Sequence, residues 1–190
     1  MLNELVLKNR SYRAFDESRP ISERDMRALV ELARFVPSGM NKQPLRYRIL
    51  SEKQELDAML HNCRFGTAIK GLKLPPEGHA PTGYILIFTD KEAGSPATLA
   101  LKDVGIAAQT ILLAATEKGF GGCMLGSFDP ARLMADFAVD DRYEPQLAIA
   151  LGKPAERVLL TDEHNGSLTY YRDAAGNHCV PKRDLDDVLI

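Results

Sequence analysis

The chain has 190 residues, 45% of them hydrophobic and 26% charged, with a formal net charge of -2. This length and balance are typical of one globular domain, so we expect residues 1–190 to form a single domain. The small negative charge argues against general nucleic-acid binding, which needs a basic face. No apolar run approaches the roughly 20 residues of a membrane span, and the first residues do not resemble a signal peptide. The sequence therefore predicts a cytoplasmic protein that has no membrane segment.

The first half of the chain predicts helices separated by one strand. Residues 2–7 form a short apolar-polar helix. Ser22 is a good N-cap with Asp25 three residues on, so a second helix begins there, and Pro37 ends it. Residues 46–50 alternate like a strand with one wet face, and residues 51–60 have helical spacing. Residues 65–81 contain several Pro and Gly and are expected to be irregular.

The second half contains the strongest signals. Residues 83–88 and 146–151 are continuous apolar runs, typical of interior strands. Residues 103–118 are apolar nearly all round, which predicts a helix buried in a core or between subunits. Asp129 can cap a further helix, and turns are expected at Asn165–Gly166 and at 175–177. Since strands and helices alternate only loosely, the sequence favours an α+β fold.

Several residue types point away from a metal or a catalytic nucleophile. Three cysteines are widely spaced without a CxxC pair, so they predict neither a disulfide framework nor a zinc site. The four histidines have no metal-ligand spacing, and no nucleophile elbow is present. We expect no metal and no catalytic side chain.

Two short segments suggest a bound cofactor that has an anionic tail and a polar heterocyclic head. Arg10, Ser11 and Arg13 bring two guanidiniums and a hydroxyl together, a receptor for phosphate, although they could simply be solvated surface groups. The loop 37–46 is bounded by prolines. The Asn41 and Gln43 amides of this loop could recognise the edge of a heterocycle, or could satisfy loop backbone groups.

The glycine-rich run at residues 119–126 lacks the ending of a phosphate loop and the spacing of a dinucleotide fingerprint. Its glycines would let backbone N–H groups approach a flat ligand. Alternatively, Gly119 is a helix C-cap followed by a buried strand, and both interpretations can hold. Near the C-terminus, Lys182 and Arg183 could complete an anion site.

Taken in order, these motifs resemble the nitroreductase-like FMN-dependent flavoprotein family, and its compact subgroup in particular. The resemblance covers nearly the whole chain. It rests on Arg10-Ser11-Tyr12-Arg13-x-Phe15, Pro37-Ser38-x-x-Asn41-x-Gln43-Pro44-x-Arg46, the helix that follows Asp103, Gly119-Phe120-Gly121, Leu151-Gly152-Lys153-Pro154, Tyr170 to Asp173, and Pro181-Lys182-Arg183.

The resemblance implies a nitroreductase-like α+β fold, with a mostly antiparallel sheet flanked by helices. It also implies an interlocked homodimer with two FMN sites at the subunit interface. Residues 65–83 would be a variable substrate-pocket segment. Residues 159–190 would be a C-terminal extension that contributes to the FMN site or to the dimer.

The resemblance also assigns residues to the cofactor. Arg10, Ser11 and Arg183, with Lys182 assisting, would hold the FMN phosphate, and Arg13 would lie near the pyrimidine edge. The remaining contacts would come from Pro37, Ser38 and Asn41 of the other subunit with Gln43 nearby, and from the backbone of Leu125 and Gly126. Asn9 stands where many members carry a second Arg, so the phosphate clamp has one cation fewer.

The implied activity is FMN-dependent oxidation of NADH or NADPH, with reduction of a nitroaromatic, a quinone or a similar small acceptor in a two-step, ping-pong hydride cycle. FMN would carry the chemistry. The alternatives are a flavin-dependent oxidase, a dehalogenase or a flavin-modifying enzyme on the same scaffold, or a non-enzymatic FMN-binding protein.

Overall fold

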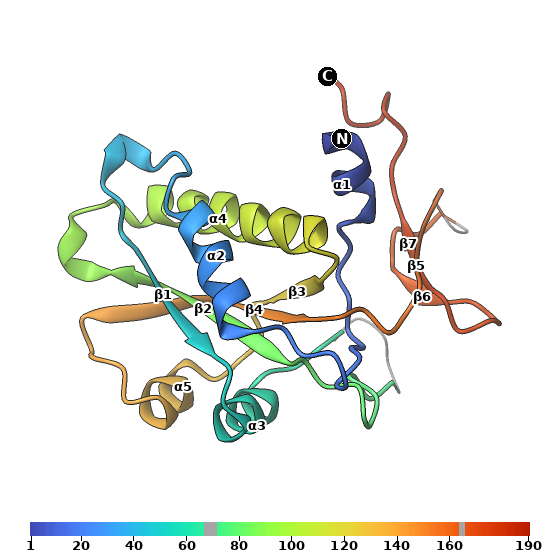
Figure 1. Cartoon of the computed structure of the whole chain (residues 1–190). Coiled ribbons are helices and arrows are strands. Elements are labelled where there is room, and N and C mark those ends of the chain that lie inside the picture. Colours follow the sequence, from blue (N-terminus) through green and yellow to red (C-terminus); the bar gives the residue numbers. More distant parts are fainter. Residues whose placement is uncertain (67–71, 164–165) are drawn as a thin grey trace.

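The computed structural model describes residues 1–66, 72–163 and 166–190 (Figure 1). An antiparallel sheet with strand order β1-β2-β4-β3 forms its centre, which confirms the α+β class. Its strands are β1 (Leu45–Leu50), β2 (Gly83–Asp90), β3 (Gly121–Leu125) and β4 (Tyr143–Gly152). The helices are α1 (Leu2–Lys8), α2 (Glu23–Ala33), α3 (Lys53–Asn62), α4 (Ala97–Glu117) and α5 (Pro130–Asp136), with the 3-10 turns η1 (Gly39–Asn41) and η2 (Lys91–Ala93).

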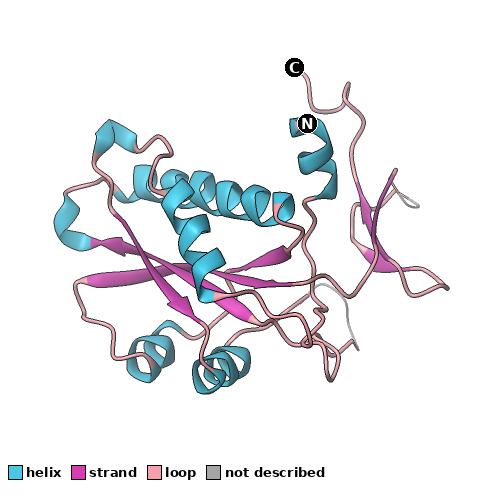
Figure 2. Cartoon of the chain, in the orientation of Figure 1, coloured by secondary structure: helices cyan, strands magenta, loops and turns pink. Residues whose placement is uncertain are grey.

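Helices cover both faces of this sheet (Figure 2). On one face, Ile85 and Ile87 of β2 belong to a core shared with α2 and α4. On the other face, Tyr84 and Leu86 belong to a second core that includes Met59 of α3 and residues of α5. Because successive side chains of a strand point to opposite faces, a strand buried on both sides must be apolar throughout. This explains the uninterrupted apolar run of β2.

Local capping fixes where two helices begin. Ser22 Oγ accepts a hydrogen bond from the Asp25 backbone N–H at 3.0 Å and donates to Asp25 Oδ2 at 2.6 Å. Asp129 accepts from the Arg132 backbone N–H at 3.1 Å. Both N-caps were expected from the sequence, and both are confirmed.

Helix α4 is longer than predicted, because it begins at Ala97, directly after Pro96, rather than at Asp103. Within one chain it is buried on one side, since Leu101 is 56% exposed and Ile106 is 42% exposed. Burial of its other side between subunits stays a prediction. By length and composition α4 could cross a membrane, but it packs against α2, β3 and the sheet as a core helix does.

A second, smaller sheet was not predicted. It consists of β5 (Val158–Thr161), β6 (Tyr171–Arg172) and β7 (His178–Pro181), in the order β5-β7-β6, and stands beside the main body in Figure 1. The predicted turn at 175–177 joins β6 to β7, with Gly176 at a φ of 80°. The other predicted turn includes residue 165, outside the described residues. The described parts of 65–81 contain no helix or named strand, as expected, and residues 67–71 lie outside the description.

Candidate functional site

The N-terminal basic segment lies along β3. Ser11 forms a parallel bridge with Gly122, and the Tyr12 backbone N–H donates to the Gly122 carbonyl at 3.0 Å. A Cβ added to Gly121 would lie 2.4 Å from Cδ2 of Tyr12, so only glycine permits this approach. Ser11 is therefore held beside the strand that ends at Leu125, and Gly126 follows in an exposed position. Gly119, at a φ of 77°, follows α4 as the C-cap interpretation expects.

The two arginines of this segment are half-buried rather than solvated. Nη2 of Arg10 donates to the Val6 carbonyl of α1 at 2.6 Å. Nη1 of Arg13 donates to the Ser11 carbonyl at 3.2 Å. In both side chains Nε is buried and has no hydrogen-bond partner among the described residues. Because an unpaired buried donor is costly, these N–H groups fit an anionic or acceptor-rich ligand that would satisfy them.

Sequence reasoning missed the residues that surround Arg13. Its guanidinium lies 3.0 Å from Nε2 of His178 and 4.9 Å from the ring centroid of Tyr170. The Arg13 backbone N–H donates to Glu156, which also pairs with Arg172. These partners lie 143 or more residues away along the chain, so no local pattern could have revealed the cluster.

The environment of His178 is unusual for a histidine. The side chain is buried, and burial, with Arg13 and Arg172 close by, lowers the pKa of His178 to about 4. Its ring meets Tyr170 edge-on, with centroids 5.2 Å apart. A histidine with so low a pKa is neutral at physiological pH.

The C-terminal basic pair follows this cluster on β7. Lys182 and Arg183 are both exposed, and the Lys182 backbone N–H donates to the Thr161 carbonyl at 2.8 Å. Since β7 begins at His178 against Arg13, the C-terminal sheet and the N-terminal segment are in contact. No described contact joins either basic side chain to Arg10 or Ser11, so their shared phosphate site stays a prediction.

The second candidate segment is a strained loop around η1. Met40, Asn41 and Gln43 have φ values of 54°, 53° and 47°, in the left-handed region that non-glycine residues seldom adopt. Such strain persists only where the surroundings hold it, and it is concentrated at functional sites. Here Asp103 of α4, 3% exposed, holds the loop. It accepts from Ser38 Oγ at 2.6 Å and from the Gly39 backbone N–H at 3.0 Å.

The two amides of this loop bond to each other. Gln43 Nε2 donates to Asn41 Oδ1 at 3.1 Å, and both side chains are exposed. The alternative interpretation was that these amides bond the backbone groups of the loop. Among the described hydrogen bonds, neither amide side chain does so. That role belongs to Ser38, whose Oγ accepts from the Gln43 N–H at 2.9 Å, and to Arg46, which donates to the Gln43 carbonyl. The amide atoms left over, Asn41 Nδ2 and Gln43 Oε1, are a donor and an acceptor at the surface.

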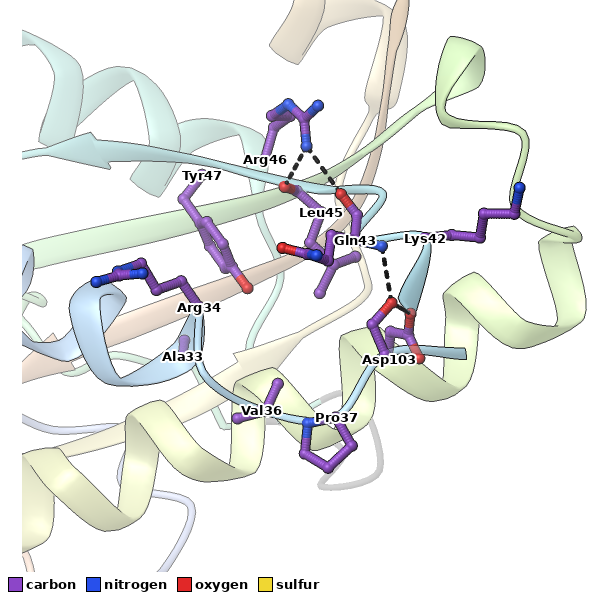
Figure 3. Close-up of a pocket in the computed structure, with 11 residues that line it drawn as sticks. Ala33, Arg34, Val36, Pro37, Lys42, Gln43, Leu45, Arg46, Tyr47 and Asp103 are labelled. Atoms are coloured by element: carbon purple, nitrogen blue, oxygen red, sulfur yellow. Dashed lines mark hydrogen bonds between the residues drawn. The ribbon is translucent and has the colours of Figure 1, made fainter. Parts of the chain in front are cut away.

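A cavity of about 360 Å³ opens beside this loop (Figure 3). Its lining includes the predicted residues Pro37, Ser38 and Gln43 but not the basic segment or the C-terminal pair. Tyr47 and Asp103 also line it, and burial raises the pKa of Tyr47 to about 12, with a further contribution from the Asp103 charge.

The two halves of the candidate site lie at opposite ends of α4. Gly39 of the loop packs against Leu99 of α4, since a Cβ added to Gly39 would lie 3.0 Å from that side chain. Gly122, which pairs with Ser11, packs against Leu112 of α4, since a Cβ added there would lie 2.7 Å from it. At a rise of 1.5 Å per residue, these contacts are roughly 20 Å apart along the helix. One chain therefore does not bring Ser38 and Asn41 to the same small ring as Ser11 and Arg13.

The model of the nitroreductase family matches residues 6–153. The chain belongs to the nitroreductase family. A Bacillus subtilis relative, provisionally named NAD(P)H nitroreductase YodC, is 28% identical over 80% of this chain and 90% of its own length.

Solved structures confirm the nitroreductase fold. A provisionally named nitroreductase of Desulfovibrio desulfuricans, solved in complex with FMN, superposes with a TM-score of 0.75 at 25% identity, over 100% of this chain and 95% of that one. A nitroreductase family protein of Streptococcus pneumoniae has a TM-score of 0.73 at 18% identity, over 100% and 99% of the two chains. The resemblance drawn from the motifs is thus confirmed for family and fold.

Proposed function

We propose that this protein is an FMN-dependent NAD(P)H oxidoreductase that reduces nitroaromatics, quinones or similar small acceptors. The observation that carries the proposal is the pair of unsatisfied buried donors, Arg10 Nε and Arg13 Nε, on the segment whose Ser11 bridges Gly122 of β3. These donors suit a phosphorylated, acceptor-rich heterocycle, and a member of the family was solved in complex with FMN.

The residues that would hold FMN have separate tasks. Arg10 and Ser11, with Arg183 and Lys182, would bind the phosphate, and Arg13 would donate to the pyrimidine edge. The backbone at Leu125 and Gly126 would contact the other side of the ring system. When bound, FMN accepts a hydride from NAD(P)H and passes reducing equivalents to the acceptor. The chain's own groups bind and orient the reactants, and none is needed as a nucleophile.

The site requires a second subunit, so we propose a homodimer. Pro37, Ser38, Asn41 and Gln43 would come from the partner, because in one chain they lie at the far end of α4. Exposed apolar residues support such an interface. They belong to α1, α4 and the C-terminal segment: Leu2, Val6, Leu7, Leu101, Ile106, Leu185, Val188 and Leu189. Contiguous apolar surface is typical of an interaction site, and two of these elements, α1 and α4, are in contact.

An absorbance spectrum tests the proposal directly. The purified protein, reconstituted with FMN, should be yellow, bleach on anaerobic addition of NADH or NADPH, and regain colour with a nitroaromatic or a quinone. Reconstituted protein that never bleaches with either nucleotide would overturn the reductase assignment. Oxygen uptake, or loss of flavin absorbance without an added acceptor, would instead indicate an oxidase or a flavin-modifying enzyme.

A further inference from the structure

Arg13 is held by residues that lie outside the part of the chain matched to the family. The match ends at residue 153, whereas Glu156, Tyr170, Arg172 and His178 all follow it. Nη1 of Arg13 bonds both the Ser11 carbonyl and Nε2 of His178, and the guanidinium stacks on Tyr170. The C-terminal sheet therefore fixes a side chain that belongs to the N-terminal motif.

The chemistry of the Arg13–His178 contact determines the state of the imidazole. A guanidinium can only donate hydrogen bonds, so Nε2 of His178 must accept and must carry no proton. The imidazole is then neutral, with its hydrogen on Nδ1. A protonated ring would place two cations 3.0 Å apart and lose the bond.

The surrounding charges leave the cluster cationic at Arg13. Glu156 pairs with Arg172 and also accepts from the Arg13 backbone N–H. Two guanidiniums, one carboxylate and one neutral imidazole leave a single formal positive charge. Glu156 already forms an ion pair with Arg172. Among the described side chains, the positive charge of Arg13 therefore has no carboxylate partner.

The way in which Arg13 is held leaves one edge of its guanidinium without a described hydrogen bond. Both described side-chain hydrogen bonds leave from Nη1. Nε is buried without a partner among the described residues, and no described hydrogen bond uses Nη2. Nε and Nη2 form the side of the guanidinium that binds two adjacent acceptors at once. The ring stacked on the guanidinium and the imidazole at Nη1 together restrict its rotation.

We propose that His178 is a positioning residue. Its neutral imidazole holds Nη1 so that the Nε/Nη2 edge of Arg13 faces two neighbouring acceptor atoms on the pyrimidine edge of bound FMN. This inference rests on the proposed function. It predicts that His178 acts on the cofactor only through Arg13, and that its effect is largest when reduction places more negative charge on that edge.

Two matched amide variants test this proposal. His178→Gln places an acceptor near the position of Nε2, whereas His178→Asn is one methylene shorter and cannot reach Nη1. We expect the ratio of the affinities for reduced and oxidised FMN to be about tenfold smaller in the Asn variant than in the wild type. For a two-electron couple this is a shift of about 30 mV to a more negative midpoint potential. The Gln variant should keep the wild-type potential. Equal shifts in the two variants, or no shift in the Asn variant, would overturn the proposal.

A double-mutant cycle tests whether the effect passes through Arg13. In an Arg13→Met background, His178→Asn should cause no further change in potential, and an additive shift would contradict the proposal. His61→Leu, at an exposed site on α3, controls for loss of an unrelated histidine. If the Asn variant does not fold, ¹⁵N NMR of the wild-type protein is sufficient, since a His178 ring protonated at Nε2 would refute the arrangement. Failure of the proposed function is a different result, because the wild-type protein itself would then bind no FMN or resist reduction.

Discussion

Ser38 and Asp103 are 65 residues apart in sequence, yet Ser38 Oγ donates to Asp103 Oδ2 at 2.6 Å. The same carboxylate accepts from the Gly39 backbone N–H, so one side chain of α4 holds the start of the strained loop. Without it, Met40 and Asn41 would lose the support for their positive φ values. A helix therefore positions the start of this loop, in addition to the hydrogen bonds that Ser38 and Arg46 make to Gln43.

Replacing Asp103 should therefore destabilise the protein. Asp103→Ala removes the acceptor for two partly buried donors, Ser38 Oγ and the Gly39 N–H, and leaving such a group unsatisfied costs about 1–3 kcal/mol. We expect the free energy of unfolding, measured by urea denaturation, to fall by that amount. Asp103→Asn keeps one acceptor oxygen and should lose less. An Ala variant as stable as the wild type would show that the loop does not depend on this residue.

The close packing of Gly122 in β3 gives a second prediction. An added Cβ would lie 2.5 Å from the Ala150 carbonyl oxygen, a backbone atom that cannot move aside easily. Gly122→Ala should therefore destabilise the sheet by about 1–3 kcal/mol, the usual cost of overpacking. Gly126→Ala is the matched control because nothing lies within 4 Å of its added Cβ. If both variants unfold at the same urea concentration, β3 is not as tightly packed as described.

Acid stability should depend on Asp90, whose carboxylate accepts hydrogen bonds from Arg142 at 2.7 Å and 2.8 Å and from Arg46 at 2.9 Å. The Arg142 hydrogen bonds lower the pKa of Asp90 from 3.8 to about 2. A lowered folded-state pKa gives stability that is present above pH 3.8 and is lost as the pH falls towards 2. Thermal unfolding between pH 5 and 2 should show a smaller loss for Asp90→Asn than for the wild type, and parallel curves would contradict this.

The sequence predicted those parts of the fold that depend on local patterns. Ser22 and Asp129 were recognised as caps, and β2 and β4 as interior strands, because capping and burial on both faces leave a signature in adjacent residues. The C-terminal sheet was missed because β5 and β7 are short and pair across a long connection. Single-sequence patterns carry little information about such pairings.

The same limit applies to the site. The basic segment and the loop at 37–46 were located from composition and order, but their supports were not. Asp103 was visible as an acid in an apolar helix, a signal that could have been pursued. His178 gave no such signal, because its role depends on Arg13, 165 residues earlier.

The phosphate role of Arg10 can be measured by FMN titration. Arg10→Ala removes a cation and a buried Nε donor, and a hydrogen bond to a charged group contributes about 1.5–3 kcal/mol. FMN affinity should fall by roughly one to two orders of magnitude, which follows from that energy. Arg27→Ala, on the exposed side of α2, should leave affinity unchanged. An Arg10 variant with wild-type affinity would show that Arg10 has been assigned wrongly.

The loss of stability in mildly acidic solution should depend on His178. Its pKa is lowered from 6.5 to about 4 by burial first and by the nearby Arg13 second, with Arg172 adding to the effect and Glu156 opposing it. The unfolded chain therefore binds a proton between these two values that the folded chain does not. Stability from this source is complete above pH 6.5 and is lost as the pH falls towards 4. His178→Gln cannot titrate, so its melting temperature should decline less than that of the wild type between pH 7 and 4. Identical declines would mean that the imidazole binds its proton as readily in the folded protein as in the unfolded chain, and the Arg13 contact would then have to be abandoned.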